Sequence, residues 1–369
     1  MELTRIIHPI GQGGFYTETL RDGNEEVNVV YDCGGFYKLK QSKQQMINYL
    51  QTSYGSKDID AVFISHFDYD HINGLEYLLD PKNKYNVKYL FLPQLEEYEI
   101  IEVLASNLSK VSILQDKRFY DFIIKLIDGD YSLSQSLQIV FVSRYNNNTI
   151  TNGIDINSLS AGIIPTGTNI CFFDKWEYIP YNPPKISKTV NGETFYECFK
   201  REIGDFSPKE FPNKIQGKVN QCKKIYKDFF GKHNSYSMTL YSGRKDTVSN
   251  NAFVKCAYKC ERCEIDTTNP NCLYMGDFEK NSISDMKTFY NQLNLWTNIQ
   301  SIQVPHHGSR HNYSPDLYDC ATCGFMSCGT TNTFHHPGQE TLMGMVGNGC
   351  QPLITTEEPK SKIRFHYVE

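Results

Sequence analysis

Ala61-Val-Phe-Ile-Ser-His-Phe-Asp-Tyr-Asp-His-Ile-Asn-Gly74 is an apolar run followed at once by a cluster of metal-capable side chains. The first four residues are apolar and partly β-branched, which predicts a buried strand. Loops that follow buried strands commonly carry functional residues, because the rigid sheet positions them. Unpaired charge at a sheet end is costly, so we predict a metal site from the four side chains His66, Asp68, Asp70 and His71.

Four short motifs follow far downstream. They are His233-Asn-Ser-Tyr-Ser-Met-Thr-Leu240, Leu273-Tyr-Met-Gly-Asp277, Val304-Pro-His-His-Gly-Ser309 and Asn332-Thr-Phe-His-His-Pro337. With His-x-Asp-x-Asp-His they resemble, in this order, the metallo-β-lactamase superfamily in its variant with Asp in place of the second His. The series looks most like the hydrolase domain of DNA-uptake competence proteins, and cell-wall phosphorylcholine esterases look similar. The resemblance implies an α/β fold, the αββα sandwich of two facing mixed sheets, with the metals at one edge.

The resemblance also implies two divalent metal ions, Zn or Mn, and a set of ligands. The first ion would be held by His66, Asp68 and His233, and the second by Asp70, His71 and His307. Asp277 would bridge them, since a carboxylate can span two cations about 3.5–4 Å apart. A hydroxide that bridges the metals would attack the substrate, and Asp70 would orient it. The carboxylate of Asp68 makes the first site harder, which favours zinc or manganese.

Two ligand assignments stay open in the sequence. His306 stands beside His307 and is an alternative ligand. In the resemblance, many relatives carry only the residue equivalent to Asn234, so either His233 closes the first site or that site is open and binds its metal weakly.

Four further residues are expected to help the centre. By resemblance, Asp32 would support the metal loop from behind. His336 would contact a phosphate or protonate the leaving oxygen, with Asn332 recurring beside it; the alternative is a turn-stabilising His before proline. Ser309 is placed to meet an anionic substrate.

We expect one domain over residues 1–369, with an insertion at 144–232, where the pattern loosens into Asn-, Pro- and Tyr-rich pieces. Within it, the spacing of the apolar residues predicts a helix over 212–230, and this helix carries several lysines. These lysines form either a solvated face or a lip that attracts phosphate groups.

Twelve cysteines in a chain without a recognisable signal peptide indicate a reducing, cytoplasmic location. The sequence contains no run of about 18 apolar residues, so no membrane span is predicted. The segment 243–272 reads as a turn-rich loop whose thiols could hold a structural zinc ion; alternatively, the last of them faces the core. These thiols are Cys256, Cys260, Cys263 and Cys272.

Together these features predict a metal-dependent hydrolase, specifically a phosphodiesterase or nuclease that acts on nucleic acid or a nucleotide. The net charge of −5 argues against a generally basic nucleic-acid-coating surface. The alternatives are an acyl hydrolase for thioesters or lactams, and a metal-stabilised binding protein with a vestigial site.

Overall fold

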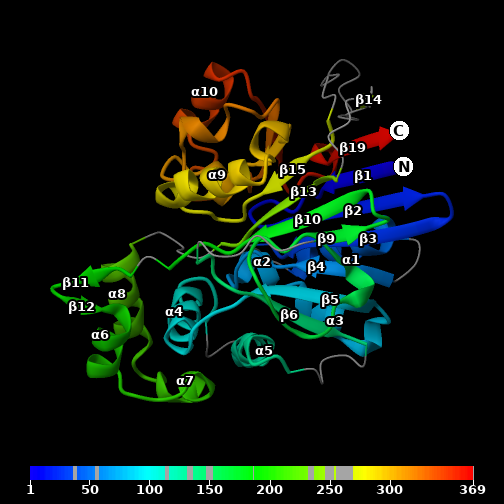
Figure 1. Cartoon of the computed structure of the whole chain (residues 1–369). Helices are drawn as coiled ribbons and strands as arrows, with labels where there is room; N and C mark the ends of the chain where they lie inside the picture. Colours follow the sequence, from blue (N-terminus) through cyan, green and yellow to red (C-terminus); the bar gives the residue numbers. More distant parts are fainter. Residues whose placement is uncertain are drawn as a thin grey trace.

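Two large β-sheets face each other at the centre of the chain (Figure 1). The computed structural model describes residues 1–35, 40–54, 58–112, 116–130, 136–146, 153–185, 187–231, 237–245, 253–254 and 269–368. Within these residues the first sheet has nine strands, in the spatial order β14 (Phe253–Val254), β19 (Ile363–Val368), β1 (Glu2–Ile7), β2 (Phe15–Asp22), β3 (Glu25–Cys33), β4 (Asp58–Phe63), β5 (Asn86–Pro93), β6 (Gln138–Val142) and β8 (Gly162–Ile164).

The second sheet has eight strands among the described residues. Their spatial order is β18 (Gln351–Thr355), β17 (Cys323–Ser327), β16 (Ser301–Gln303), β15 (Cys272–Tyr274), β13 (Thr239–Arg244), β10 (Trp176–Tyr181), β9 (Ile170–Phe172) and β7 (Ile154–Asp155). Strands β3, β4, β5, β6 and β8 run parallel in the first sheet, as do β15 to β18 in the second. Each sheet therefore presents a row of carboxyl-terminal strand ends on which loops can carry functional residues.

Helices cover the outer face of each sheet (Figure 1). On the first sheet lie α1 (Lys40–Ser53), α2 (Tyr69–Ile72), α3 (Leu75–Leu79), α4 (Glu97–Asn107) and α5 (Lys117–Ile127). On the second lie α9 (Ile283–Gln292) and α10 (Gln339–Gly347). A third apolar layer fills the space between the sheets. The predicted αββα sandwich is confirmed by this arrangement.

The strand predicted at the start of the metal motif is β4. Its residues Ile59 to Phe63 are all buried, because one face packs between the sheets and the other against the helices. This two-sided burial explains why Ala61 to Ile64 form a continuous apolar run rather than an alternating pattern.

The segment expected to be an insertion divides into two parts. Strand β8 belongs to the first sheet, and strands β7, β9 and β10 belong to the second. Residues 154–181 are therefore part of the sandwich. The segment that stands outside the sheets carries β11 (Thr189–Val190), β12 (Glu193–Thr194), α6 (Phe195–Glu202), α7 (Phe211–Lys214) and α8 (Val219–Phe230). Helices α6 and α8 pack against α4. None of the described helices is both long and apolar enough to cross a membrane.

Candidate metal centre

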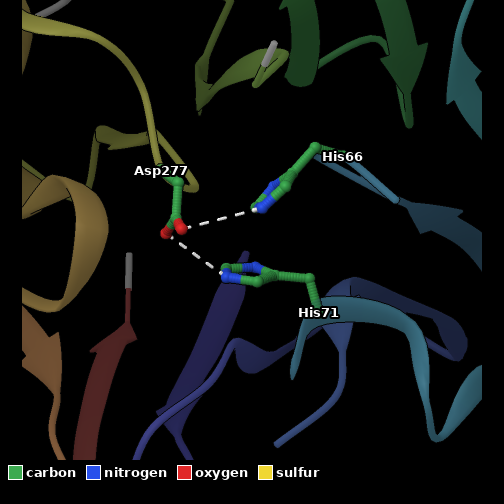
Figure 2. A group of neighbouring side chains, drawn as sticks. All are labelled: His66, His71 and Asp277. Carbon is green, nitrogen blue, oxygen red and sulfur yellow. Dashed lines mark ion pairs between the residues drawn. The ribbon is translucent and has the colours of Figure 1, made fainter. Parts of the chain in front are cut away.

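The metal-capable side chains gather where the two rows of strand ends meet. His66, Asp68, Asp70 and His71 follow β4 in the first sheet, whereas Asp277 and His307 follow β15 and β16 in the second. Figure 2 shows His66, His71 and Asp277 turned toward one another. The centre therefore lies between the sheets, and each sheet contributes part of it.

Three buried histidines each have one ring nitrogen anchored and the other directed inward. Nδ1 of His71 lies 2.7 Å from Asp32 Oδ2, and Nδ1 of His307 lies 3.0 Å from the Ser327 carbonyl oxygen. Nδ1 of His66 lies 2.9 Å from Ser65 Oγ. The three Nε2 atoms are buried, and among the described residues they have no hydrogen-bond partner. Buried polar atoms are normally satisfied, so this pattern is the one expected of metal-ligating imidazoles.

Four side chains converge at distances close to those of a tetrahedral metal site. His71 Nε2 lies 3.3 Å from Asp277 Oδ1, and His307 Nε2 lies 3.8 Å from the same oxygen. Asp70 Oδ2 lies 3.5 Å from His307 Nε2. Donors about 2.0–2.2 Å from a tetrahedral zinc ion lie about 3.3–3.6 Å from one another. The residues therefore fit a divalent ion at the position predicted for the second metal.

The position predicted for the first metal is less complete. His66 Nε2 lies 3.7 Å from Asp277 Oδ2 and 3.8 Å from Asp68 Oδ2. His66, His71 and Asp277 form one potential ligand group among the described residues, and Asp70, His71 and His307 form the other. Asp68 belongs to neither group.

A lysine that the sequence did not point to contacts both loop carboxylates. Lys110 Nζ lies 2.7 Å from Asp68 Oδ2 and 2.7 Å from Asp70 Oδ1. The preceding Ser106 donates a hydrogen bond to Asp68 Oδ1, and Asn107 bonds Phe67 and Tyr69 through its side chain. No pattern in the sequence pointed to this support, because Ser106, Asn107 and Lys110 lie 38 to 42 residues from the loop residues that they contact.

The charges in the centre shift the pKa values of its members in opposite directions. Burial raises the pKa of Asp70, but Lys110 and the neighbouring histidines lower it by more, so the carboxylate stays ionised. Asp277 behaves likewise, with His306 and His71 lowering its pKa. Burial lowers the pKa of His66 to about 4, so this imidazole is neutral and able to bind metal at neutral pH.

Asp32 contacts the loop at Ser65 and at His71. Its Oδ1 accepts a hydrogen bond from the Ser65 backbone N–H and its Oδ2 from the Ser65 hydroxyl, while Oδ2 also meets His71. The side chain is fully buried. It thus fixes both the start of the metal loop and the orientation of one imidazole.

The late histidines occupy different places. His307 is buried and directed at Asp70, whereas His306 is less buried, with Nδ1 3.7 Å from Asp277 Oδ2. The ring of His336 lies 6.1 Å from that of His307, centroid to centroid. Asn332 holds the His336 backbone at both its N–H and its carbonyl, each at 2.9 Å. Ser309 is buried, and its hydroxyl accepts a hydrogen bond from the His311 backbone.

Several predicted site residues lie outside the described residues. These are His233, Asn234, Cys256, Cys260 and Cys263. Cys272 is described and is fully buried between the two sheets. The structural zinc site and the closing ligand of the first metal site therefore stay predictions.

Comparison with known proteins supports the superfamily. Residues 20–91, which include β3, β4 and the metal loop, match the family model "Metallo-beta-lactamase superfamily". This match confirms the resemblance at superfamily level, while the narrower resemblance to competence proteins stays a prediction. No curated protein matches the chain. Among solved structures, the metallo-beta-lactamase fold protein YhfI from Bacillus subtilis is similar, with 8% identity and a TM-score of 0.36, over 97% of this chain and 98% of that chain.

Proposed function

We propose that this chain is a metal-dependent hydrolase that cleaves phosphodiester bonds in nucleic acid or a nucleotide. The observation that carries the proposal is the group Asp70, His71, His307 and Asp277, whose donor atoms converge from both sheets at metal-ligand spacing. A bound divalent ion would supply a Lewis acid and an acidified water molecule, which are the requirements of ester hydrolysis at neutral pH.

The surrounding residues keep these ligands in a reactive arrangement. Asp32 and the Ser327 carbonyl hold His71 and His307 by their Nδ1 atoms, so their Nε2 atoms are left to bind an ion and would hold it there. The carboxylate of Asp70 is anchored by Lys110 at one oxygen, which leaves the other oxygen toward His307. A ligand set held in this way needs little reorganisation when substrate binds.

His336 is the candidate to assist the leaving group. Its Nδ1 lies 3.3 Å from Gln12 Nε2, and when this amide donates, the imidazole proton resides on Nε2. Burial, together with the charges of His307 and His306, lowers the pKa of His336 to about 3. The residue is then a neutral imidazole whose Nε2–H can donate to a phosphoryl or leaving oxygen.

Two features favour a phosphate substrate over an acyl substrate. The ligand set is rich in carboxylates, which suit hard, oxygen-binding ions such as manganese. In addition, α8 carries Lys223, Lys224 and Lys227, and it packs against α4, whose last residue contacts the metal loop. Basic side chains near a metal centre attract polyanionic substrates.

A substrate panel tests the proposal. Metal-loaded protein is assayed with bis-p-nitrophenyl phosphate, linear and circular DNA, RNA and cyclic nucleotides, and in parallel with thioester and β-lactam probes. We expect turnover of phosphodiesters that is lost in Asp277→Asn. Turnover of the acyl probes alone would make the chain an acyl hydrolase, and bound metal without any turnover would make it a binding protein.

A further inference from the structure

We propose that the ammonium group of Lys110 takes the cation position of the first metal site, so that the centre is built for one divalent ion and one fixed lysine charge. The inference deepens the proposed function and rests on it. It departs from the two-metal centre that the resemblance implies.

The contacts of Asp68 are the first support. Asp68 Oδ1 accepts a hydrogen bond from Ser106 at 3.0 Å, and Oδ2 meets Lys110 Nζ at 2.7 Å. Both oxygens are thereby engaged by α4 and the turn that follows it. This explains why Asp68, predicted to be a ligand, belongs to neither potential ligand group among the described residues.

The contacts of Asp70 are the second support. Its Oδ1 meets Lys110 Nζ at 2.7 Å, whereas its Oδ2 faces His307 Nε2 at 3.5 Å. The carboxylate therefore separates two cation positions, one filled by the ammonium and one suited to a metal ion. The Lys110 side chain is only 20% exposed, so the charge is held in the centre rather than in solvent.

A divalent ion and this ammonium would compete for the same oxygen. An ion bound to Asp68 Oδ2 would lie about 2.0–2.2 Å from it, while Lys110 lies 2.7 Å from that oxygen. The resulting repulsion between cations would be strong in so buried a place. Because the chain itself supplies Lys110 at no cost in association entropy, the lysine has the advantage over an exchangeable ion.

Metal content measured on the full chain tests the inference. Protein is loaded with manganese and dialysed, the manganese is counted by elemental analysis, and the electron paramagnetic resonance spectrum is recorded. Wild type should bind one ion per chain and give the spectrum of an isolated ion. Lys110→Met, which keeps the length of the side chain but removes its charge, should bind two ions and show spin coupling between them.

Lys185→Met is the matched control. Lys185 also bridges two buried carboxylates, at 3.6 Å from Glu99 and 3.0 Å from Glu102, and is 11% exposed. Its replacement should leave one ion per chain.

Asp68→Asn gives a second, independent comparison. If the lysine fills the position, this variant keeps one ion, whereas a true first metal site would lose one of two. Two ions in wild type, or one ion in Lys110→Met, would overturn this inference and leave the proposed metal centre standing. Wild type without any bound ion would overturn the proposed metal centre together with it.

Discussion

Asp32 determines which nitrogen of His71 faces the centre. Its carboxylate accepts a hydrogen bond from His71 Nδ1 at 2.7 Å. The backbone of Asp32 is left-handed, with φ 53°, a conformation that asparagine tolerates well. In Asp32→Asn we therefore expect the fold to persist while metal affinity falls about 10–100-fold, because the imidazole loses its charged partner. Competition with a chelator of known affinity measures the change.

The control for this variant is Asp60→Asn. Asp60 is also buried and accepts from the Asn28 backbone and from Lys88, but it lies at the other end of the first sheet's strands. Equal losses of metal affinity in both variants would mean that Asp32 acts through general stability.

His307 and His336 are predicted to differ in what they hold. His307→Ala should lose metal and rate together, because a ligand nitrogen is removed. His336→Ala should keep the metal and the fold but lose about 10²–10³ in kcat if the Nε2–H of its neutral imidazole donates a hydrogen bond to the leaving oxygen. That loss should shrink for p-nitrophenolate, which is a stable anion and needs little stabilisation as it leaves. Metal analysis beside kinetics on two leaving groups separates the roles.

A His336→Ala protein without metal would show that the two assignments are exchanged. Normal rates on every substrate would make His336 a turn residue held by Asn332.

Single residues were predictable from the sequence where motif and local spacing carry the information. His66, Asp70 and His71 stand within one short loop after a strand, so their proximity follows from the chain itself. Lys110 reaches the same loop across 42 and 40 residues, and only the packing of α4 brings it there. No pattern in one sequence reports such a contact.

At the scale of elements, the end of α4 holds the metal loop by hydrogen bonds. The Asn107 side chain accepts from the Tyr69 N–H and donates to the Phe67 carbonyl, at 2.8 and 3.0 Å, and it is fully buried. Asn107→Ala leaves a buried backbone N–H unsatisfied, so the free energy of unfolding should fall by about 1–3 kcal/mol. Denaturant unfolding measures this loss, and metal titration should show weaker binding.

Asn348→Ala is the comparison for that variant, because Asn348 is exposed and its side chain donates to the Gly344 carbonyl at the end of its own helix. A similar loss of metal affinity in both variants would mean that α4 does not specifically support the metal centre.

Helix α8 is predicted to contact a polymeric substrate. Lys224 and Lys227 are exposed and Lys223 is half-buried, while the apolar face of the helix packs toward α4 and α6. Neutralising all three with glutamine should raise KM for DNA or RNA and flatten its salt dependence, since fewer counterions are released. Cleavage of bis-p-nitrophenyl phosphate should hardly change.

Lys82→Gln with Lys84→Gln serves as the control. Both lysines are exposed in the connection before β5, at the opposite end of the sheet from the metal loop. Unchanged kinetics in the α8 variant would leave its lysines as a solvated face.

Long elements were easier to predict than short ones. The apolar run of β4 indicated a buried strand directly, whereas β7, β8 and β9 have only two or three residues each. Such short strands carry no periodicity, and their pairing depends on neighbours elsewhere in the chain. This is why the strands within residues 154–181 could not be recognised in the loosened pattern of the segment predicted to be an insertion.

At the scale of the whole molecule, the candidate metal centre draws its residues from both sheets. Asp70 and His71 belong to the first sheet's loops, and Asp277 and His307 to the second's. An ion bound between them is therefore expected to stabilise the sandwich as a whole. The stabilisation should be on the order of 2.7 kcal/mol at free metal one hundred times Kd. Removal of metal with a chelator should lower Tm, and restoring zinc or manganese should recover it.

The same titration in Asp277→Asn decides whether the metal acts at this centre. The variant loses the carboxylate that lies near His66, His71 and His307. Added metal should therefore no longer raise its Tm, while its unfolding should stay cooperative. If the shift persists in Asp277→Asn, the stabilising ion is bound elsewhere, and the two sheets are joined by the apolar layer between them alone. If wild type shows no shift although metal is bound, the ion has equal affinity for the folded and the unfolded chain, which contradicts a site assembled from both sheets.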